Sequence, residues 1–205
     1  MKDIYQRSCP YSAALQQATK GKLPSKTRHL VVTRYREDLA WLNLVEATRV
    51  TVYNKGEYFF GYVPLPNIGR DAHTPFYHLA NNYNNLSDIT YFCQGNPFDR
   101  VFGLLEALKY LQCVDFIALG TDVLEQAEPG VELRGLWEEL FGEPCPSGWT
   151  FRACITFGVS RKRVHRRSQA FYEKCERLFH DGGSGISAES MPYVFEQLVG
   201  RIFLD

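Results

Sequence analysis

The stretch His29-Leu-Val-Val-Thr-Arg-Tyr-Arg-Glu-Asp38 decides the fold class of this chain. Its first half is a continuous apolar run with β-branched residues, which is typical of a strand that is covered on both faces. The run ends abruptly at charged residues, and the following Leu39-Ala-Trp-Leu42 indicates the start of a helix. A doubly covered strand that leads through a polar loop into a helix is how an α/β unit begins.

Further strand and helix patterns alternate along the chain. Strand patterns occur at 50–53, 88–92, 115–119 and 152–159, and helical patterns at 71–83, 102–111, 168–179 and 192–203, whereas residues 128–149 are the least regular. Alternation of this kind requires crossover connections and favours parallel strands. We therefore expect one α/β domain over residues 28–205, with a Rossmann-like, mainly parallel but mixed sheet flanked by helices. Residues 1–27 are expected to form a polar N-terminal extension with a short helix and a linker.

The composition disfavours several classes of partner. The chain has 23 Lys and Arg against 23 Asp and Glu, so no global field attracts nucleic acid or an anionic membrane. No apolar run approaches the roughly 20 residues that span a bilayer, and the first ten residues lack the apolar segment of a secretory signal. We therefore expect a cytoplasmic protein without membrane contact.

The six cysteines show neither C-x-x-C pairs nor zinc-site spacing. Cys113, Cys154 and Cys175 lie in apolar-rich stretches, where a thiol packs as a small hydrophobic group. Reduced core cysteines are therefore expected, rather than a disulfide scaffold or a cysteine nucleophile.

Polar clusters follow three of the predicted strands, and ligands of open parallel sheets bind at the carboxyl ends of strands. After the first strand come Arg34 and Glu37, and after the second come Asn54 and Lys55. Arg34 can hold a phosphate or carboxylate through its bidentate guanidinium group. The alternative, equally open for Arg34, is that Asp38 caps the next helix while its neighbours are solvated.

The densest polar cluster is Asn67-Ile-Gly-Arg-Asp-Ala-His-Thr74. A glycine before a helix start lets backbone N–H groups approach an anion, and the helix dipole favours negative charge there. Arg70 adds positive charge, and His73 can transfer protons or bind a metal. The alternative is an ordinary helix capped by Asp71 with a surface histidine, but the combination of the three side chains favours a functional site.

Two further clusters are open to both functional and structural interpretations. Gln94 and Asp99, after the third strand, can bind ligand hydroxyls or hold a divalent ion by oxygen, but Asp99 equally suits a helix cap. The run Arg161–Arg167 can bind phosphates, although such runs are usually solvated. Zero net charge and the lack of interleaved aromatic residues disfavour nucleic acid. Walker, G-x-G-x-x-G, G-x-S-x-G and H-E-x-x-H motifs are absent from the sequence.

Several blocks of sequence together resemble an uncharacterised family that is catalogued as a domain of unknown function. The resemblance spans roughly residues 30–203. The blocks, in order, are Val-Val-Thr-Arg-Tyr-Arg-Glu-Asp-Leu-Ala-Trp-Leu (31–42), Val-Tyr-Asn-Lys-Gly (52–56), Pro-Asn-Ile-Gly-Arg-Asp-Ala-His-Thr (66–74), Asn-Tyr-Asn-Asn-Leu-Ser-Asp-Ile-Thr-Tyr-Phe-Cys-Gln-Gly (82–95), Phe-Gly-Val-Ser-Arg (157–161) and Phe-Tyr-Glu-Lys (171–174).

The layout of that family is similar to nucleotide-sugar glycosyltransferases of the GT-A type. The resemblance implies a nucleotide bound after the first strand and an Asp-x-Asp metal site at a central strand end. It places Arg34 and Glu37 near the nucleotide base or ribose, and Arg70 near the diphosphate. Gln94 and Asp99 would lie near the sugar or the metal, and Glu196 would lie on the acceptor side.

This chain departs from that pattern at the expected metal site. Cys93-Gln-Gly-Asn96 stands where Asp-x-Asp is expected, and Arg100 stands where many members of the family carry histidine. Both departures disfavour a bound Mn²⁺ or Mg²⁺. A metal-free transferase would instead stabilise the diphosphate with Arg70, Lys55 or the run that begins at Arg161.

Three hypotheses follow. The first is a glycosyltransferase-like enzyme that transfers a sugar from a nucleotide-activated donor to an acceptor, with Asp71, Asp99 or Glu196 as base. The second is a non-catalytic module of the same fold that binds a nucleotide or phosphorylated ligand. The third, ranked last because no nucleophile motif accompanies it, is a hydrolase that uses His73 with Asp71.

Overall fold

The computed structural model describes residues 26–101, 103–110, 115–120, 123–126, 128–152 and 155–204. Six strands form a sheet in the order β3-β2-β1-β4-β8-β5. These are β1 (Arg28–Arg34), β2 (Arg49–Asn54), β3 (Val63–Pro64), β4 (Ile89–Gln94), β5 (Phe116–Ala118) and β8 (Phe157–Ser160), and β6 (Val123–Gln126) pairs separately with β7 (Trp149–Arg152). The expected helix and linker of the N-terminal extension fall almost wholly outside the described residues.

The pairing is mostly parallel. Strand β1 runs parallel to both β2 and β4, and β2 runs parallel to β3. Strand β8 is antiparallel to β4 on one side and to β5 on the other. The chain is therefore a single α/β domain with a mixed, Rossmann-like sheet, as the sequence predicts.

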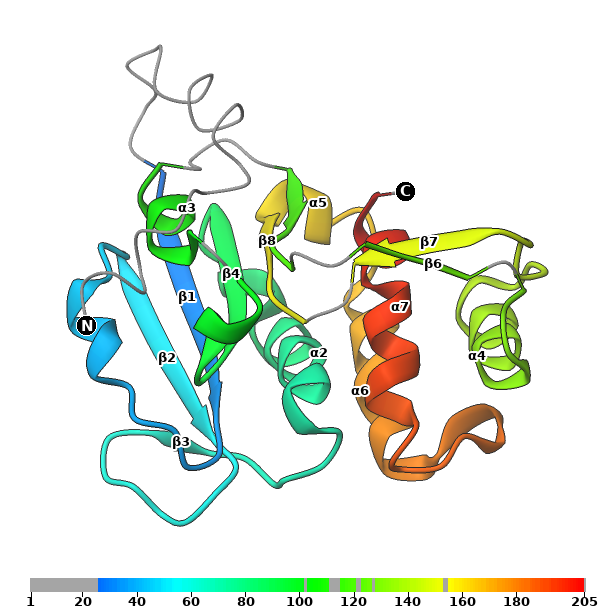
Figure 1. The fold of residues 1–205 in the computed structure, drawn as a ribbon, viewed down its shortest axis with the longest axis horizontal. Coiled ribbons are helices and arrows are strands. Elements are labelled where there is room, and N and C mark those ends of the chain that lie inside the picture. The colour runs from blue at the N-terminus through cyan, green and yellow to red at the C-terminus, as the bar shows by residue number, and fades with distance from the viewer. Residues whose placement is uncertain are drawn as a thin grey trace.

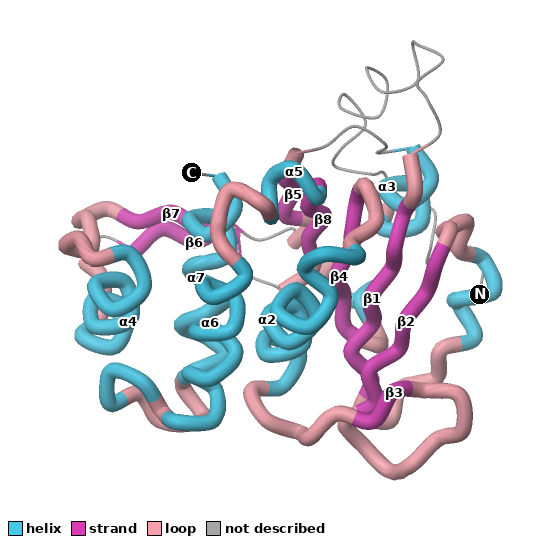
Figure 2. The backbone as a smooth tube through the Cα atoms, turned by 180° about the vertical axis from the view of Figure 1, so that it is seen from behind, coloured by secondary structure: helices cyan, strands magenta, loops and turns pink. Residues whose placement is uncertain are grey.

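Helices cover both faces of the sheet (Figures 1 and 2). One face carries α2 (Arg70–Asn82), α6 (Gln169–Asp181) and α7 (Met191–Leu204), and the other carries α3 (Leu104–Tyr110). The short helices are η2 (Ala40–Leu44), η3 (Tyr83–Asn85), η4 (Pro97–Asp99), α5 (Arg161–Val164) and η5 (Gly183–Gly185). Among the described residues, no helix is long and apolar enough to cross a membrane.

Coverage of both faces explains the apolar run in β1. Val31 belongs to the core cluster formed with α2, α6 and α7, whereas Leu30 and Val32 belong to the cluster on the opposite face. All three side chains are at most 1% exposed. Successive side chains of a strand point to opposite faces of the sheet. When both faces are covered, every position of the strand favours an apolar residue.

The region 128–149 is more regular than expected. It contains the helix α4 (Val131–Phe141), which is flanked by glycines and buries Leu133, Leu136, Trp137 and Leu140. These residues share one helix face, so the amphipathic period was present in the sequence but hidden among Pro and Gly signals. The single strand expected over 152–159 is also incorrect, because β7 ends at Arg152 and β8 begins at Phe157.

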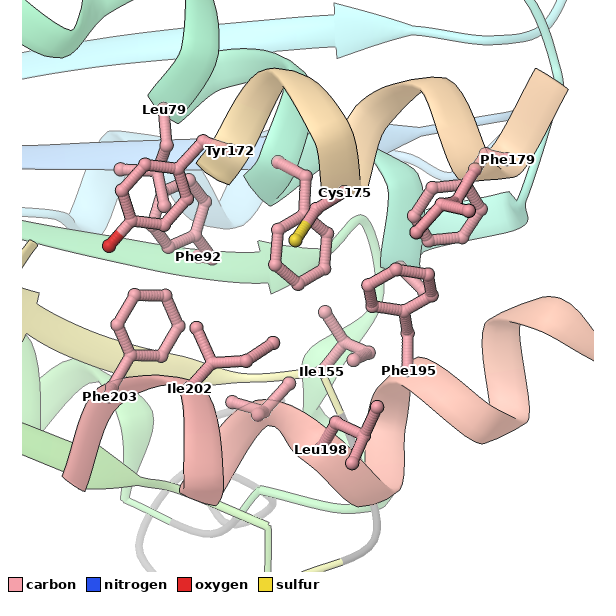
Figure 3. Packing of buried hydrophobic residues seen from close by; sticks show 14 of the residues in the cluster. Leu79, Phe92, Ile155, Tyr172, Cys175, Phe179, Phe195, Leu198, Ile202 and Phe203 are labelled. Atoms are coloured by element: carbon pink, nitrogen blue, oxygen red, sulfur yellow. The ribbon is translucent and has the colours of Figure 1, made fainter. Parts of the chain in front are cut away.

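Aromatic packing joins α6 to α7 in the larger core cluster (Figure 3). The rings of Phe179 and Phe195 stack with centroids 4.4 Å apart, and Phe76 of α2 lies 4.8 Å from Phe195. Cys175 is buried between these layers as a free thiol, as expected. Cys113 and Cys154 lie outside the described residues. The packed rings of Phe76, Phe179 and Phe195 thus join α2, α6 and α7.

Ends of these three helices meet where the parallel strands end. Helices α2 and α7 begin, and α6 ends, at the lower end of the molecule in Figure 1, which is also where β2 and β4 end. This carboxyl edge of the sheet is where α/β folds bind ligands.

We expect Gly56→Ala to destabilise the protein by about 1–3 kcal/mol, because an added methyl group overpacks the turn after β2. A Cβ at Gly56 would lie 1.8 Å from the carbonyl oxygen of Tyr35, and that backbone has to move. Urea unfolding measures the change. The matched substitution is Gly200→Ala within helix α7, where an added Cβ would only touch Leu204 Cδ1 at 4.0 Å, an ordinary van der Waals contact. It is expected to stabilise the protein by about 0.5–1 kcal/mol. Equal stability of the two variants would contradict this account of the turn.

Candidate functional site

A polar pocket lies at the carboxyl edge, between the end of β4 and the beginnings of α2 and α7. Its volume is about 210 Å³. We call it the edge pocket, and its polar lining consists of Arg70, Asp71, Gln94, Arg100, Tyr193 and Glu196. Four of the predicted site residues therefore meet here from three distant parts of the chain.

Arg70 occupies an unusual backbone conformation at the start of α2. Its φ is +48°, and among the described residues no other non-glycine residue has a positive φ. The left-handed region costs a side-chain-bearing residue about 1–2 kcal/mol. The Arg70 guanidinium group donates to Tyr193 Oη at 2.6 Å and lies 5.4 Å from the centre of that ring. Backbone strain concentrates at functional sites, so this conformation makes Arg70 a candidate functional residue.

The carboxyl group of Asp71 in the pocket has a perturbed pKa. Its burial raises the pKa, while its own backbone N–H and the positive charges of Lys55 and Arg70 act in the opposite direction. A carboxylate with a raised pKa is a stronger base, and a base with a pKa nearer neutrality transfers protons more effectively. Asp71 is therefore suited to take a proton from a ligand hydroxyl in the edge pocket.

A second hollow adjoins the edge pocket and has a volume of about 720 Å³. We call it the adjoining groove, and its lining includes Asn67, Arg70, Phe179, His180, Glu189 and Tyr193. The hydrogen-bonded pair of Arg70 and Tyr193 lines both hollows. Together they reach the roughly 300–1,000 Å³ of small-molecule sites.

A chain of four side chains runs from the end of β2 to the end of α6. Lys55 Nζ donates to the carbonyl of Ile68 at 2.6 Å and lies 3.3 Å from His73 Nδ1. His73 Nε2 lies 3.2 Å from Glu176 Oε1, and the same oxygen lies 2.8 Å from His180 Nε2.

Burial perturbs the pKa values of this chain. It lowers the pKa of Lys55 to about 7, with Asp71 acting in the opposite direction. Burial, together with the charge of Lys55, lowers the pKa of His73 to about 4. Burial alone would raise the pKa of Glu176, but hydrogen bonds from His73 and His180 lower it. His73 is thus neutral at pH 7, and at 1% exposure it is neither a surface histidine nor part of the edge-pocket lining.

The polar residues at the ends of β1 and β2 form hydrogen bonds with one another. Arg34 Nε donates to the carbonyl of Glu37 at 3.0 Å, and its Nη1 donates to Asn54 Oδ1 at 2.8 Å. The Arg34 guanidinium also lies 5.2 Å from the ring centre of Phe59. Asp38 Oδ1 accepts from the N–H of Ala40, the first residue of η2, at 2.9 Å, although the N-cap position of that helix is occupied by Leu39 and not by Asp38. Arg34, Glu37 and Asn54 are therefore brought together, but they do not line the edge pocket.

Three further predicted residues, like those at the ends of β1 and β2, line neither hollow. Asp99 is exposed and accepts from Asn96 Nδ2 at 3.1 Å. Thr74 is fully buried in α2. Arg161 pairs with Asp88 at 2.7 Å, next to the beginning of β4 and thus at the opposite end of that strand from Gln94.

The edge pocket does not fit a Mg²⁺ or Mn²⁺ ion of the kind that GT-A enzymes hold. Such ions need several oxygen ligands, but Arg70 and Arg100 share the pocket with its carboxyl groups. Asp99 does not line the pocket, and Gln94 Nε2 donates to the carbonyl of Asn96 at 2.7 Å.

Sequence reasoning did not single out Tyr193, Glu176 or His180. Glu176 and His180 are four residues apart on α6, a spacing that places them on one helix face, so this pair was detectable. Their proximity to His73, over one hundred positions earlier in the chain, was not.

Comparisons with known proteins found no significantly similar protein. No family model matches the chain, and neither a curated protein nor a solved structure is significantly similar to it.

Proposed function

We propose that this protein is a glycosyltransferase-like enzyme that binds a nucleotide-activated sugar at the edge pocket and transfers the sugar to an acceptor hydroxyl. One observation carries the proposal. Two carboxyl groups, Asp71 and Glu196, and two guanidinium groups, Arg70 and Arg100, line one pocket at the carboxyl edge of an α/β sheet.

The proposed reaction needs both kinds of charge. A carboxylate takes the proton of the acceptor hydroxyl while the hydroxyl oxygen forms a bond to the anomeric carbon of the sugar. The bond between that carbon and the phosphate oxygen breaks, and the electron pair leaves with the nucleoside diphosphate. Arg70 and Arg100 stabilise the negative charge that develops there, in place of a metal ion.

The two hollows divide the ligand between them. The edge pocket is smaller than typical small-molecule sites and suits the sugar beside the two carboxyl groups. The larger adjoining groove suits the nucleotide, with Arg70 between them at the diphosphate. This placement of the nucleotide differs from the one that the family resemblance implies, in which the nucleotide base or ribose lies near Arg34.

Release of nucleoside diphosphate from a panel of nucleotide-sugars tests catalysis. We expect Asp71→Asn or Glu196→Gln to lower the turnover rate by about 10²–10⁴-fold, the usual contribution of a general base. Glu173→Gln, an exposed position on α6, is the control and should keep the wild-type rate. Equal rates in all three variants would contradict the assigned role of the pocket carboxyl groups.

The second candidate is a binding module without turnover. The guanidinium groups of Arg70 and Arg100 in the pocket lining favour anion recognition whether or not chemistry follows. Saturable binding of a nucleotide or nucleotide-sugar that requires Arg70, without diphosphate release for any donor and acceptor, would favour the module over the enzyme.

A further inference from the structure

We propose that His73, Glu176 and His180 form a zinc site that opens onto the adjoining groove. The three side chains offer two imidazole nitrogens and a carboxylate oxygen, all within 4.8 Å of one another. The inference is independent of the proposed transfer reaction, because it concerns a different set of side chains.

The distances suit a tetrahedral ion. Ligands bound to Zn²⁺ at about 2.0–2.1 Å lie about 3.3 Å from one another. Glu176 Oε1 already lies 3.2 Å from His73 Nε2 and 2.8 Å from His180 Nε2. Only the separation of the two histidines has to shorten, and the side chain of His180 is 41% exposed on the surface of α6.

The fold presents the ligands from rigid elements. His73 is in the first turn of α2, and Glu176 and His180 lie one turn apart on α6, which packs along α2. Lys55 Nζ lies beside Nδ1 of His73, so Nε2 is the nitrogen directed at Glu176.

The ligand set selects the metal and its role. Two imidazoles and one carboxylate suit Zn²⁺ better than Mg²⁺ or Ca²⁺, which prefer oxygen ligands. Three protein ligands leave a fourth tetrahedral position for water or a ligand group, as in catalytic rather than structural zinc sites. His180 lines the adjoining groove, so the cluster lies at the wall of that hollow.

Zinc titration of the full-length, tag-free protein in competition with a chromophoric chelator tests the site. We expect one equivalent of Zn²⁺ to bind. His180→Ala and Glu176→Gln should each weaken binding by more than about 100-fold, because loss of a ligand exceeds the 10–100-fold cost of losing an outer partner. The matched controls, His165→Ala and Glu173→Gln, change exposed residues outside the cluster and should bind Zn²⁺ as the wild type does.

Cobalt substitution identifies the donor atoms. The Co²⁺ form should show a tetrahedral d–d spectrum without a thiolate charge-transfer band, because no cysteine belongs to the cluster. Thermal unfolding of the metal-free variants confirms that they are folded. A thiolate band, absence of Zn²⁺ binding, or equal affinity in the His180→Ala and control proteins would each overturn the proposal.

Discussion

Replacing Arg70 with alanine is expected to weaken binding of the nucleotide-activated donor by about 10- to 150-fold. Hydrogen bonds to charged groups contribute roughly 1.5–3 kcal/mol, and Arg70 lines both hollows at the position proposed for the diphosphate. Alanine keeps a Cβ atom at the same left-handed φ, so the substitution removes the guanidinium group without relieving the backbone. Isothermal titration with the donor measures the change.

Two further variants sharpen that result. Arg36→Ala removes an exposed arginine whose guanidinium lies over the ring of Tyr35, and it should bind the donor like the wild type. Tyr193→Phe removes the hydroxyl that accepts from Arg70 but keeps the ring, so its loss should be smaller than that of Arg70→Ala. If Arg70→Ala and Arg36→Ala bind equally well, Arg70 has no role in recognition.

The free energy of unfolding is expected to fall by roughly 6 kcal/mol between pH 7 and pH 4 through two buried histidines. Burial, together with the charge of Arg49, lowers the pKa of His29 to about 4. Burial, together with the charges of His29 and Arg49, lowers the pKa of His78 to about 3. Their rings meet edge to face at 4.9 Å, His29 Nε2 lies 2.9 Å from Thr51 Oγ1, and each histidine is 1% exposed. His29 Nδ1 and His78 Nε2 are buried without a hydrogen-bond partner, so a second proton on either ring would create a buried charge that nothing solvates.

The sign follows from the proton count. Above the unfolded pKa of 6.5 both states are neutral, and the full stability is present. As the pH falls below 6.5, the unfolded state binds protons that the native state refuses, so stability decreases until the folded pKa is reached. Urea unfolding at a series of pH values, in the presence of a chelator, measures the free energy of unfolding. The slope of this free energy against pH gives the number of protons taken up on unfolding. His29→Gln and His78→Gln should each lower that number by one, and unchanged slopes would contradict this account.

The sheet was largely predictable because its signals are local. The apolar run at 29–33 indicates a doubly covered strand, and core residues from both faces enclose it in the structure. The helix α4 was missed because Pro and Gly around it mask an amphipathic period of only 11 residues. The pairing of β8 with β4 and β5 depends on contacts far apart in sequence, which no local pattern reports.

The candidate site was predictable only in part. Arg70, Asp71 and Gln94 were recognisable because they follow strands or open a helix, and that position alone brings them to the carboxyl edge. Arg161 satisfied the same charge criterion, yet the antiparallel direction of β8 carries it to the opposite end. A surface position was one of the two alternatives that the sequence left open for His73, but the packing of α6 on α2 buries it against Glu176.

Thermal stability against a panel of nucleotide-sugars, free nucleotides and free sugars, with and without Mn²⁺, tests the central claim most directly. A ligand at 100 times its Kd stabilises the native state by about 2.7 kcal/mol, which raises the Tm of a 205-residue protein by about 5–10 °C. The account predicts such a rise for one nucleotide-sugar in the wild type, without a requirement for Mn²⁺ and with most of the rise lost in Arg70→Ala. Absence of any rise across the panel, or an equal rise in Arg70→Ala, would contradict it.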